Sequence, residues 1–280
     1  MSNLEALLLG IVQGVTEFLP ISSSGHLILV PWLQDYRFLL DHPGFNKTFD
    51  VALHAGTLIA AIGYFRREVV SLTRGFLAAV RQRTIETPTQ RLSVAIAIGT
   101  IPAVIFGGLG AGFIEDHLGE PWMIAIQLIL FGALLLWADR LPQRKALDEA
   151  TVRDGWYIGL AQVLALAPGT SRSGITITAA RYLGLDRESA ARFSFLLLIP
   201  AVAGATVFKA ASAIHDGLPS GVAGPMIVGT IAAAISGYLA IAFLLRLVQT
   251  TSYRPFVLYR YAAGAAVLLI IATGLRPATF

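Results

Sequence analysis

The chain alternates long apolar runs with short polar segments, and the lengths of the runs predict membrane helices. Runs long enough to cross a bilayer lie at about 48–65, 92–113, 122–138, 189–211, 225–247 and 256–274. A helix rises 1.5 Å per residue, so about 20 apolar residues cross the roughly 30 Å hydrocarbon core. The runs lack the period-two alternation of barrel strands, so we expect an all-α integral membrane protein.

Two further pairs of apolar runs are too short to cross. In the first pair, residues 4–19 end at Pro20 and a second run covers about 25–33. In the second pair, residues 156–167 end at Pro168 and the apolar pattern resumes until about 183. A half-helix, a break and another half-helix describe a re-entrant hairpin, whose irregular backbone must be buried in protein or line a cavity.

Similar residues recur in the same order in the two halves of the chain. Gly10 and Gln13 recur as Gly159 and Gln162, 149 positions later, and a Ser-Gly pair recurs at the same distance. Coincidence between helices rich in small residues can explain a single match. It does not readily explain a series of matches in the same order. We therefore expect one membrane domain, 1–280, made of repeat one at 1–139, a polar connecting loop at 140–154 and repeat two at 155–280.

One re-entrant hairpin and three transmembrane helices in each repeat give an odd number of crossings, so the second copy is expected to be inverted. Inverted-topology repeats place the functional site at the repeat interface, near the middle of the membrane. The segments at 66–91 and 246–254 are rich in arginine, whereas 115–120 and 215–220 are acidic or neutral. By the positive-inside rule the basic loops are cytoplasmic, and both termini and the base of the first hairpin are extracytoplasmic.

Composition narrows the functional classes. The chain is 55% hydrophobic and 14% charged, against roughly 25% charged in soluble domains. It has no cysteine, which excludes disulfides, thiolate metal sites and a cysteine nucleophile. The formal net charge of +4 comes mainly from loops, so it indicates topology and not nucleic-acid binding.

The first hairpin carries a carboxylate and an amide in an apolar run. Gln13 and Glu17 are four residues apart and share a helix face. Such an oxygen pair suits Mg²⁺ or Ca²⁺ held together with substrate phosphates. The alternatives are a helix–helix hydrogen bond for Gln13 and a buried salt bridge for Glu17, for example with Arg172.

The serines after Pro20 open the second half-helix of this hairpin. Ser22, Ser23 and Ser24 can cap the helix, and a helix N-terminus also binds anions such as phosphate. Ser23 and His26 are three residues apart, which is the relation a serine nucleophile needs with its base. A structural hydrogen bond is the alternative for His26.

The second hairpin carries Arg172 at its break. The planar guanidinium matches phosphate oxygens, and Ser171, Ser173 and Thr176 add hydroxyl groups beside it. The alternative for Arg172 is a side chain that extends to the membrane surface. In the run at 48–65, Asp50 and His54 share a face and are expected near the site, with His54 as a structural polar contact.

These two motifs together resemble those of the bacterial undecaprenyl-diphosphate phosphatases, also called bacitracin-resistance proteins. The motifs are Gln-x-x-x-Glu-Phe-Leu-Pro-Ile-Ser-Ser-Ser-Gly-His at 13–26 and Pro-Gly-Thr-Ser-Arg-Ser-Gly-Ile-Thr at 168–176. The resemblance implies an interdigitated inverted-repeat fold and a site that opens to the periplasmic side. It implies functional roles for seven matching positions: Gln13, Glu17, Ser23, His26, Ser171, Arg172 and Thr176. The family's leading position takes Glu or Gln, and this chain has Gln13, so a site with two carboxylates is in doubt.

The resemblance leads to a functional hypothesis. We expect a phosphatase of the bacterial inner membrane that hydrolyses undecaprenyl diphosphate to the monophosphate and recycles this lipid for peptidoglycan. Glu17, Ser23, His26 and Arg172 would be catalytic, with Ser23, His26 or water as the nucleophile. The alternatives are a transporter or flippase of an anionic isoprenyl lipid and a structural scaffold. We leave the oligomeric state open, with a homodimer as one alternative.

Overall fold

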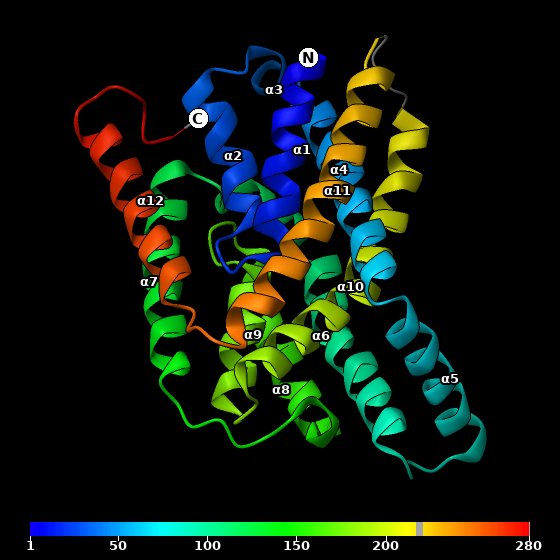
Figure 1. Ribbon diagram of the computed structural model, residues 1–280. Coiled ribbons are helices and arrows are strands. Elements are labelled where there is room, and N and C mark those ends of the chain that lie inside the picture. Colours follow the sequence, from blue (N-terminus) through cyan, green and yellow to red (C-terminus); the bar gives the residue numbers. More distant parts are fainter. Residues whose placement is uncertain (217–220, 280) are drawn as a thin grey trace.

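The structure is a computed structural model that describes residues 1–216 and 221–279, apart from the side chains at 43, 111–116 and 208–216 (Figure 1). The described part of the chain is helical, as expected, and has no named strand. Its elements in chain order are α1 (Asn3–Phe18), α2 (Ser23–Gln34), α3 (Arg37–Asp41), α4 (Pro43–Tyr64), α5 (Arg66–Gln82), α6 (Pro88–His117), α7 (Pro121–Asp139), η1 (Leu147–Glu149), α8 (Val152–Val163), η2 (Leu164–Leu166), α9 (Arg172–Tyr182), α10 (Arg187–Asp216), α11 (Ala223–Val248) and α12 (Arg254–Ala272).

Most of the predicted membrane spans are confirmed. Within the described residues, α6, α7, α10, α11 and α12 each contain a segment long and apolar enough to cross a membrane. The run predicted at 48–65 is helix α4, but it meets the same criterion only together with α5, from which it is bent by 84°. Five helices, or six with this bent pair, make the chain a multi-pass membrane protein.

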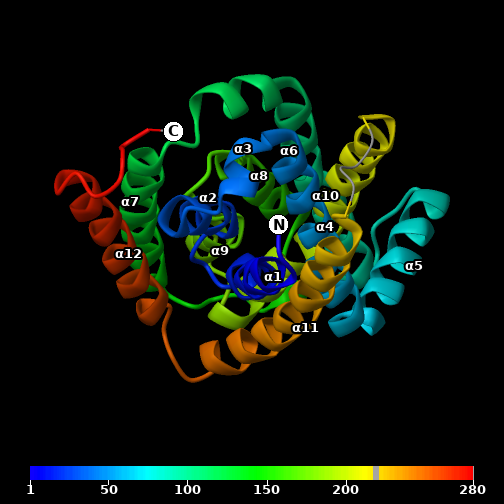
Figure 2. The same ribbon diagram turned by 90° about the horizontal axis from the view of Figure 1, so that it is seen from above.

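The two predicted hairpins are present as the pairs α1/α2 and α8/α9. In Figure 1 the first pair descends from the upper side, where both termini lie, and the second pair rises from the lower side. Figure 2, the view from above, places α1, α2 and α9 near the centre, with α7, α12, α11 and α10 around them. The two breaks therefore meet inside the molecule.

Both breaks have the same local geometry. Ser22 and Ser171 each precede a half-helix and have positive φ angles of 79° and 74°. Each side chain caps its helix by accepting a hydrogen bond from the backbone N–H three residues later, at Gly25 and Gly174. Positive φ is uncommon for residues other than glycine, so its occurrence at both serines marks a backbone held in place by its surroundings.

Close helix contacts also occur in matching pairs. A Cβ added to Gly10 would lie 2.4 Å from the carbonyl oxygen of Gly229, and one added to Gly159 would lie 2.2 Å from that of Gly99. Small residues let membrane helices approach closely, here α1 on α11 and α8 on α6. These pairings are consistent with the expected inverted repeat.

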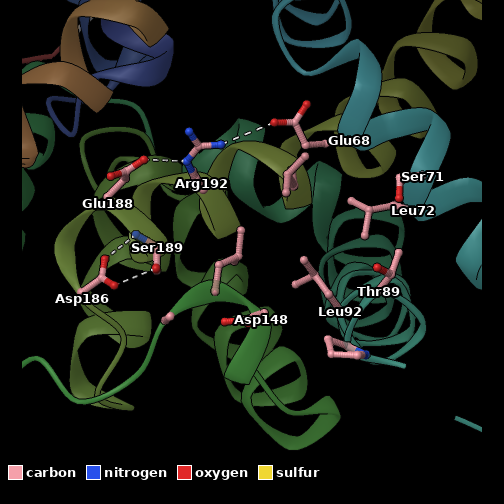
Figure 3. A pocket seen from close by; sticks show the side chains of 14 residues that line it. Glu68, Ser71, Leu72, Thr89, Leu92, Asp148, Asp186, Glu188, Ser189 and Arg192 are labelled. Atoms are coloured by element: carbon pink, nitrogen blue, oxygen red, sulfur yellow. Dashed lines mark hydrogen bonds and ion pairs between the residues drawn. The ribbon is translucent and has the colours of Figure 1, made fainter. Parts of the chain in front are cut away.

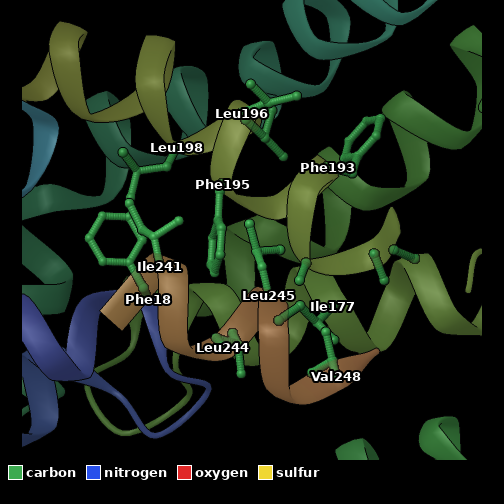
Figure 4. Close-up of a cluster of buried hydrophobic side chains, with 14 of the residues drawn as sticks. Phe18, Ile177, Phe193, Phe195, Leu196, Leu198, Ile241, Leu244, Leu245 and Val248 are labelled. Atoms are coloured by element: carbon green, nitrogen blue, oxygen red, sulfur yellow. The ribbon is translucent and has the colours of Figure 1, made fainter. Parts of the chain in front are cut away.

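A hydrophobic core lies beside the end of α1 (Figure 4). Phe18, at the end of α1, is fully buried and contacts the ring of Phe195 on α10 edge to face, with centroids 5.3 Å apart. Ile241 and Leu245 of α11 complete this cluster from the other side. The packing fixes the end of α1 and therefore the direction of the neighbouring Glu17.

Two polar segments predicted as loops are partly helical. Residues 66–82 of the basic segment form α5, because apolar residues recur on one face of this stretch while arginines occupy the other. The connecting loop predicted at 140–154 contains η1 and ends early, because Thr151 caps α8 in a capping box with Asp154. In the loop predicted at 215–220, residues 217–220 lie outside the described residues.

Candidate active site

Glu17 is the centre of a polar cluster between the two hairpins. Its side chain is 5% exposed and accepts hydrogen bonds at both oxygens. Oε1 accepts from Nη2 of Arg172 at 2.9 Å. Oε2 accepts from Oγ of Ser23 at 2.5 Å and from Nε2 of Gln13 at 3.1 Å. The predicted carboxylate, guanidinium, serine and amide therefore lie together.

Arg172 is held in this cluster from two sides. Nη2 forms the ion pair with Glu17, and Nη1 donates to the carbonyl oxygen of Ser194 on α10 at 3.0 Å. The side chain is 16% exposed, so it is directed into the protein and not towards the membrane surface. A guanidinium has five N–H groups, and these bonds use only some of them. The other N–H groups can bind phosphate.

Two of the predicted phosphate-binding serines connect the hairpins to each other. Oγ of Ser22 accepts from the backbone N–H of Gly169 at 3.1 Å, and Oγ of Ser173 donates to the carbonyl oxygen of Leu19 at 3.0 Å. Both serines are buried. These bonds fix the distance between the two breaks.

The remaining hydroxyl groups differ in burial. Ser171 caps α9, and Thr176 donates to the carbonyl oxygen of Arg172 at 2.8 Å and contacts Oγ of Ser194. Both are buried and engaged within the protein. Ser24, like Ser23, is half-buried, so these two hydroxyl groups are more accessible to a ligand.

His26 is placed differently from the sequence expectation. Nδ1 lies 2.7 Å from the carbonyl oxygen of Ser22 and must donate to it, and Nε2 lies 2.6 Å from the hydroxyl of Tyr259 on α12. The two rings are also stacked. Both nitrogens are thus engaged by groups other than Ser23, whose hydroxyl is bound to Glu17 instead.

The imidazole that lies beside Glu17 is that of His54. Its Nε2 is 3.7 Å from Oε2 of Glu17, across the contact between α4 and α1. The sequence placed His54 near the site, as a structural contact. Its short distance to the carboxylate makes it part of the polar cluster.

Arg260 was not expected from the sequence. It is fully buried in α12 and donates to the carbonyl oxygens of Pro20 in the first break and of Gly169 and Thr170 in the second. Nε donates to the carbonyl oxygen of Leu128 on α7. An arginine inside a predicted membrane span is itself a signal of a special role, and here it joins the two breaks.

The cluster also fits a divalent cation held with substrate. Oε1 of Gln13 is buried and has no hydrogen-bond partner among the described residues, and Oε2 of Glu17 lies beside the same amide. Mg²⁺ and Ca²⁺ take such oxygen ligands and complete their shells with phosphate and water. No group of three or more His, Cys, Asp or Glu side chains in the described residues forms a complete cage.

Two open pockets lie elsewhere on the molecule. One of about 480 Å³ is lined by residues of α5, α6, η1 and α10, with Arg192 between Glu68 and Glu188 (Figure 3). None of the predicted site residues lines it. A second, almost wholly apolar groove of about 600 Å³ runs between α1 and α11, from Leu7 to Leu19.

Comparison with known proteins bears on this arrangement. A family model described as "Bacitracin resistance protein BacA" matches residues 6–266, nearly the whole chain. The chain belongs to this family. Both motifs of the family resemblance lie inside the matched range, so the polar cluster is built from residues of the family domain.

Curated relatives are similar over nearly their full lengths. An undecaprenyl-diphosphatase of Geobacter sulfurreducens is 50% identical over 270 residues, which cover 96% of this chain and 98% of the relative. One of Pelobacter propionicus is 47% identical, covering 98% and 99%. One of Thermomicrobium roseum is 45% identical, covering 97% and 99%.

Proposed function

We propose that this chain is a membrane phosphatase that hydrolyses undecaprenyl diphosphate to undecaprenyl phosphate and inorganic phosphate. The observation that carries the proposal is the convergence of Arg172, Glu17 and Ser23 from two broken helices. Phosphoryl transfer depends mainly on positioning and on stabilising charge at the transferring group. Arg172 can stabilise the charge, and the hydrogen bond to Glu17 positions the hydroxyl of Ser23. The relatives described above are named undecaprenyl-diphosphatase.

In this mechanism Ser23 is the nucleophile and Glu17 is its base. The hydroxyl proton passes to the carboxylate of Glu17 while Oγ bonds to the terminal phosphorus, and the bond from phosphorus to the bridging oxygen breaks. Undecaprenyl phosphate leaves, and water then hydrolyses the phosphoserine to release phosphate. Arg172 binds the oxygens of the transferring group and stabilises their charge.

Other groups support this step. Glu17 and Gln13 would hold a divalent cation, Mg²⁺ or Ca²⁺, which when bound neutralises charge on the diphosphate oxygens. Helices α2 and α9 both begin at the breaks, and the N–H groups at a helix start favour an anion. His26 supports the loop of the first break through Ser22, and its ring is held by Tyr259.

The finer placement in the cell is part of the same proposal. We place the chain in the bacterial inner membrane with α5 on the cytoplasmic side, because α5 carries Arg66, Arg67, Arg74 and Arg81. Both termini then lie on the periplasmic side, together with the base of the first hairpin (Figure 1). A site opening to that side would receive the diphosphate lipid released during wall synthesis.

A transporter or flippase of an anionic isoprenyl lipid is the second candidate. The matching breaks at Ser22 and Ser171 favour it, because inverted repeats serve alternating access. Phosphate release from undecaprenyl diphosphate by the purified protein in detergent separates the two candidates, since no transport occurs there. Release that depends on Arg172 supports the phosphatase, and no release by the wild type refutes it.

A further inference from the structure

His54 has an unusual relation to the carboxylate beside it. Its Nδ1 lies 2.7 Å from the backbone carbonyl oxygen of Asp50, which can only accept, so Nδ1 carries the hydrogen. In the neutral ring the lone pair is then on Nε2. This nitrogen lies 3.7 Å from Oε2 of Glu17. When the ring is neutral, these two atoms are both electron-pair donors that face each other across a short gap.

The spacing of these two atoms suits a shared metal ion. Ligands bound at about 2.1 Å from one ion are at most about 4.2 Å apart, so Nε2 and Oε2 can bind the same ion without a change of backbone. A metal-ligating histidine almost always donates its other N–H to a carbonyl or carboxylate, as Nδ1 does here. The imidazole is also 31% exposed, which leaves a route of entry for the ion.

The amide at position 13 contacts the same carboxylate. A glutamate there would provide a second carboxylate, and this chain has Gln13 instead. Oε1 of Gln13 is buried without a hydrogen-bond partner among the described residues, while its Nε2 donates to Glu17. An amide oxygen is a weaker ligand than a carboxylate, so the site needs one further protein donor, and the imidazole of His54 is within reach.

We propose that Nε2 of His54 is a ligand of the divalent cation, together with Glu17, in place of a second carboxylate at position 13. This inference shares one premise with the proposed function, namely that Glu17 binds a divalent cation. An imidazole suits first-row transition metals better than Mg²⁺ or Ca²⁺, which prefer oxygen. The site should therefore accept Mn²⁺ more tightly than Mg²⁺.

The test uses the full-length protein in detergent with Mn²⁺ and no substrate. Pulsed electron paramagnetic resonance detects a nitrogen nucleus bound to Mn²⁺, and labelling the five histidines with ¹⁵N changes that signal if the nitrogen belongs to an imidazole. We expect this signal in the wild type and in His42→Gln, an exposed histidine that serves as the matched control. His54→Gln should lose the nitrogen signal and bind Mn²⁺ on the order of tenfold more weakly.

A second variant keeps the test decisive if His54→Gln does not fold. His54→Glu replaces the imidazole by a carboxylate, so it should still bind Mn²⁺ but without the nitrogen signal. A nitrogen signal that persists in either variant, or none in the wild type, overturns the inference. Wild-type protein that releases phosphate but shows no nitrogen signal refutes only the role of His54. Wild-type protein that shows the signal but releases no phosphate refutes only the proposed function.

Discussion

Arg172 and Glu17 are 155 positions apart in the chain, yet their side chains form an ion pair at 2.9 Å across the two breaks. Both are largely buried. A buried ion pair is costly to form, and removing one partner destabilises a protein by about 3–5 kcal/mol. A buried ion pair is weak evidence of a stabilising role. Its place beside Ser23 is the reason for proposing that it acts in the reaction.

The nucleophile can be identified by trapping. Because Oγ of Ser23 is bound to Glu17, we expect the transferred phosphate on Ser23. Protein quenched in acid during turnover of labelled undecaprenyl diphosphate should retain label that survives acid, as a phosphoserine does. Ser23→Ala should retain no label and lose at least about a hundredfold in kcat. An acid-labile adduct on His26 would show that the histidine attacks instead.

Arg260 should matter for the shape of the site. Its guanidinium binds carbonyl oxygens in both breaks, so Arg260→Lys keeps the charge but cannot reach all of them. We expect a loss of about 2–4 kcal/mol in stability, from hydrogen bonds to a charged group, and a lower thermal midpoint in detergent. Arg254→Lys, an exposed position on the same helix, is the control. An unchanged midpoint in Arg260→Lys would mean that the breaks hold their shape without it.

The close helix contacts give a prediction that does not depend on the chemistry. Gly10→Ala and Gly159→Ala each place a methyl group within 2.4 Å of a carbonyl oxygen of the facing helix. Overpacking of this kind destabilises by about 1–3 kcal/mol, and the helices of each pair must separate. Gly108→Ala, where no atom lies within 4 Å of the new carbon, should leave the midpoint unchanged or raise it. Equal midpoints in all three variants would contradict the packing.

The architecture could be predicted from the sequence because apolar run length depends on local properties alone. The same is true of the hairpins, since Pro20 and Pro168 interrupt runs too short to cross. The helix α5 escaped prediction because its arginines gave the whole segment the charge of a loop. Its apolar residues recur with helical spacing, which a count of charges does not register.

Contacts in the site depend on tertiary packing and were harder to predict. Ser23 and His26 have the right spacing along the helix, but packing turns the imidazole to Tyr259, which is 233 positions away. His54 and Glu17 meet only because α1 and α4 lie side by side. Arg260 could have been singled out as a charge inside a span, but its partners in both breaks could not.

The convergence of the two hairpins on one phosphate site is tested most directly by a double-mutant cycle. The rate of phosphate release from undecaprenyl diphosphate is measured for the wild type, Glu17→Gln, Arg172→Gln and the double variant. Each single variant should lose about 10³-fold or more in kcat/KM, and the double variant should be little worse than either, because the two residues act as a unit. Near-wild-type turnover in either single variant, or losses that simply multiply, would contradict a shared site.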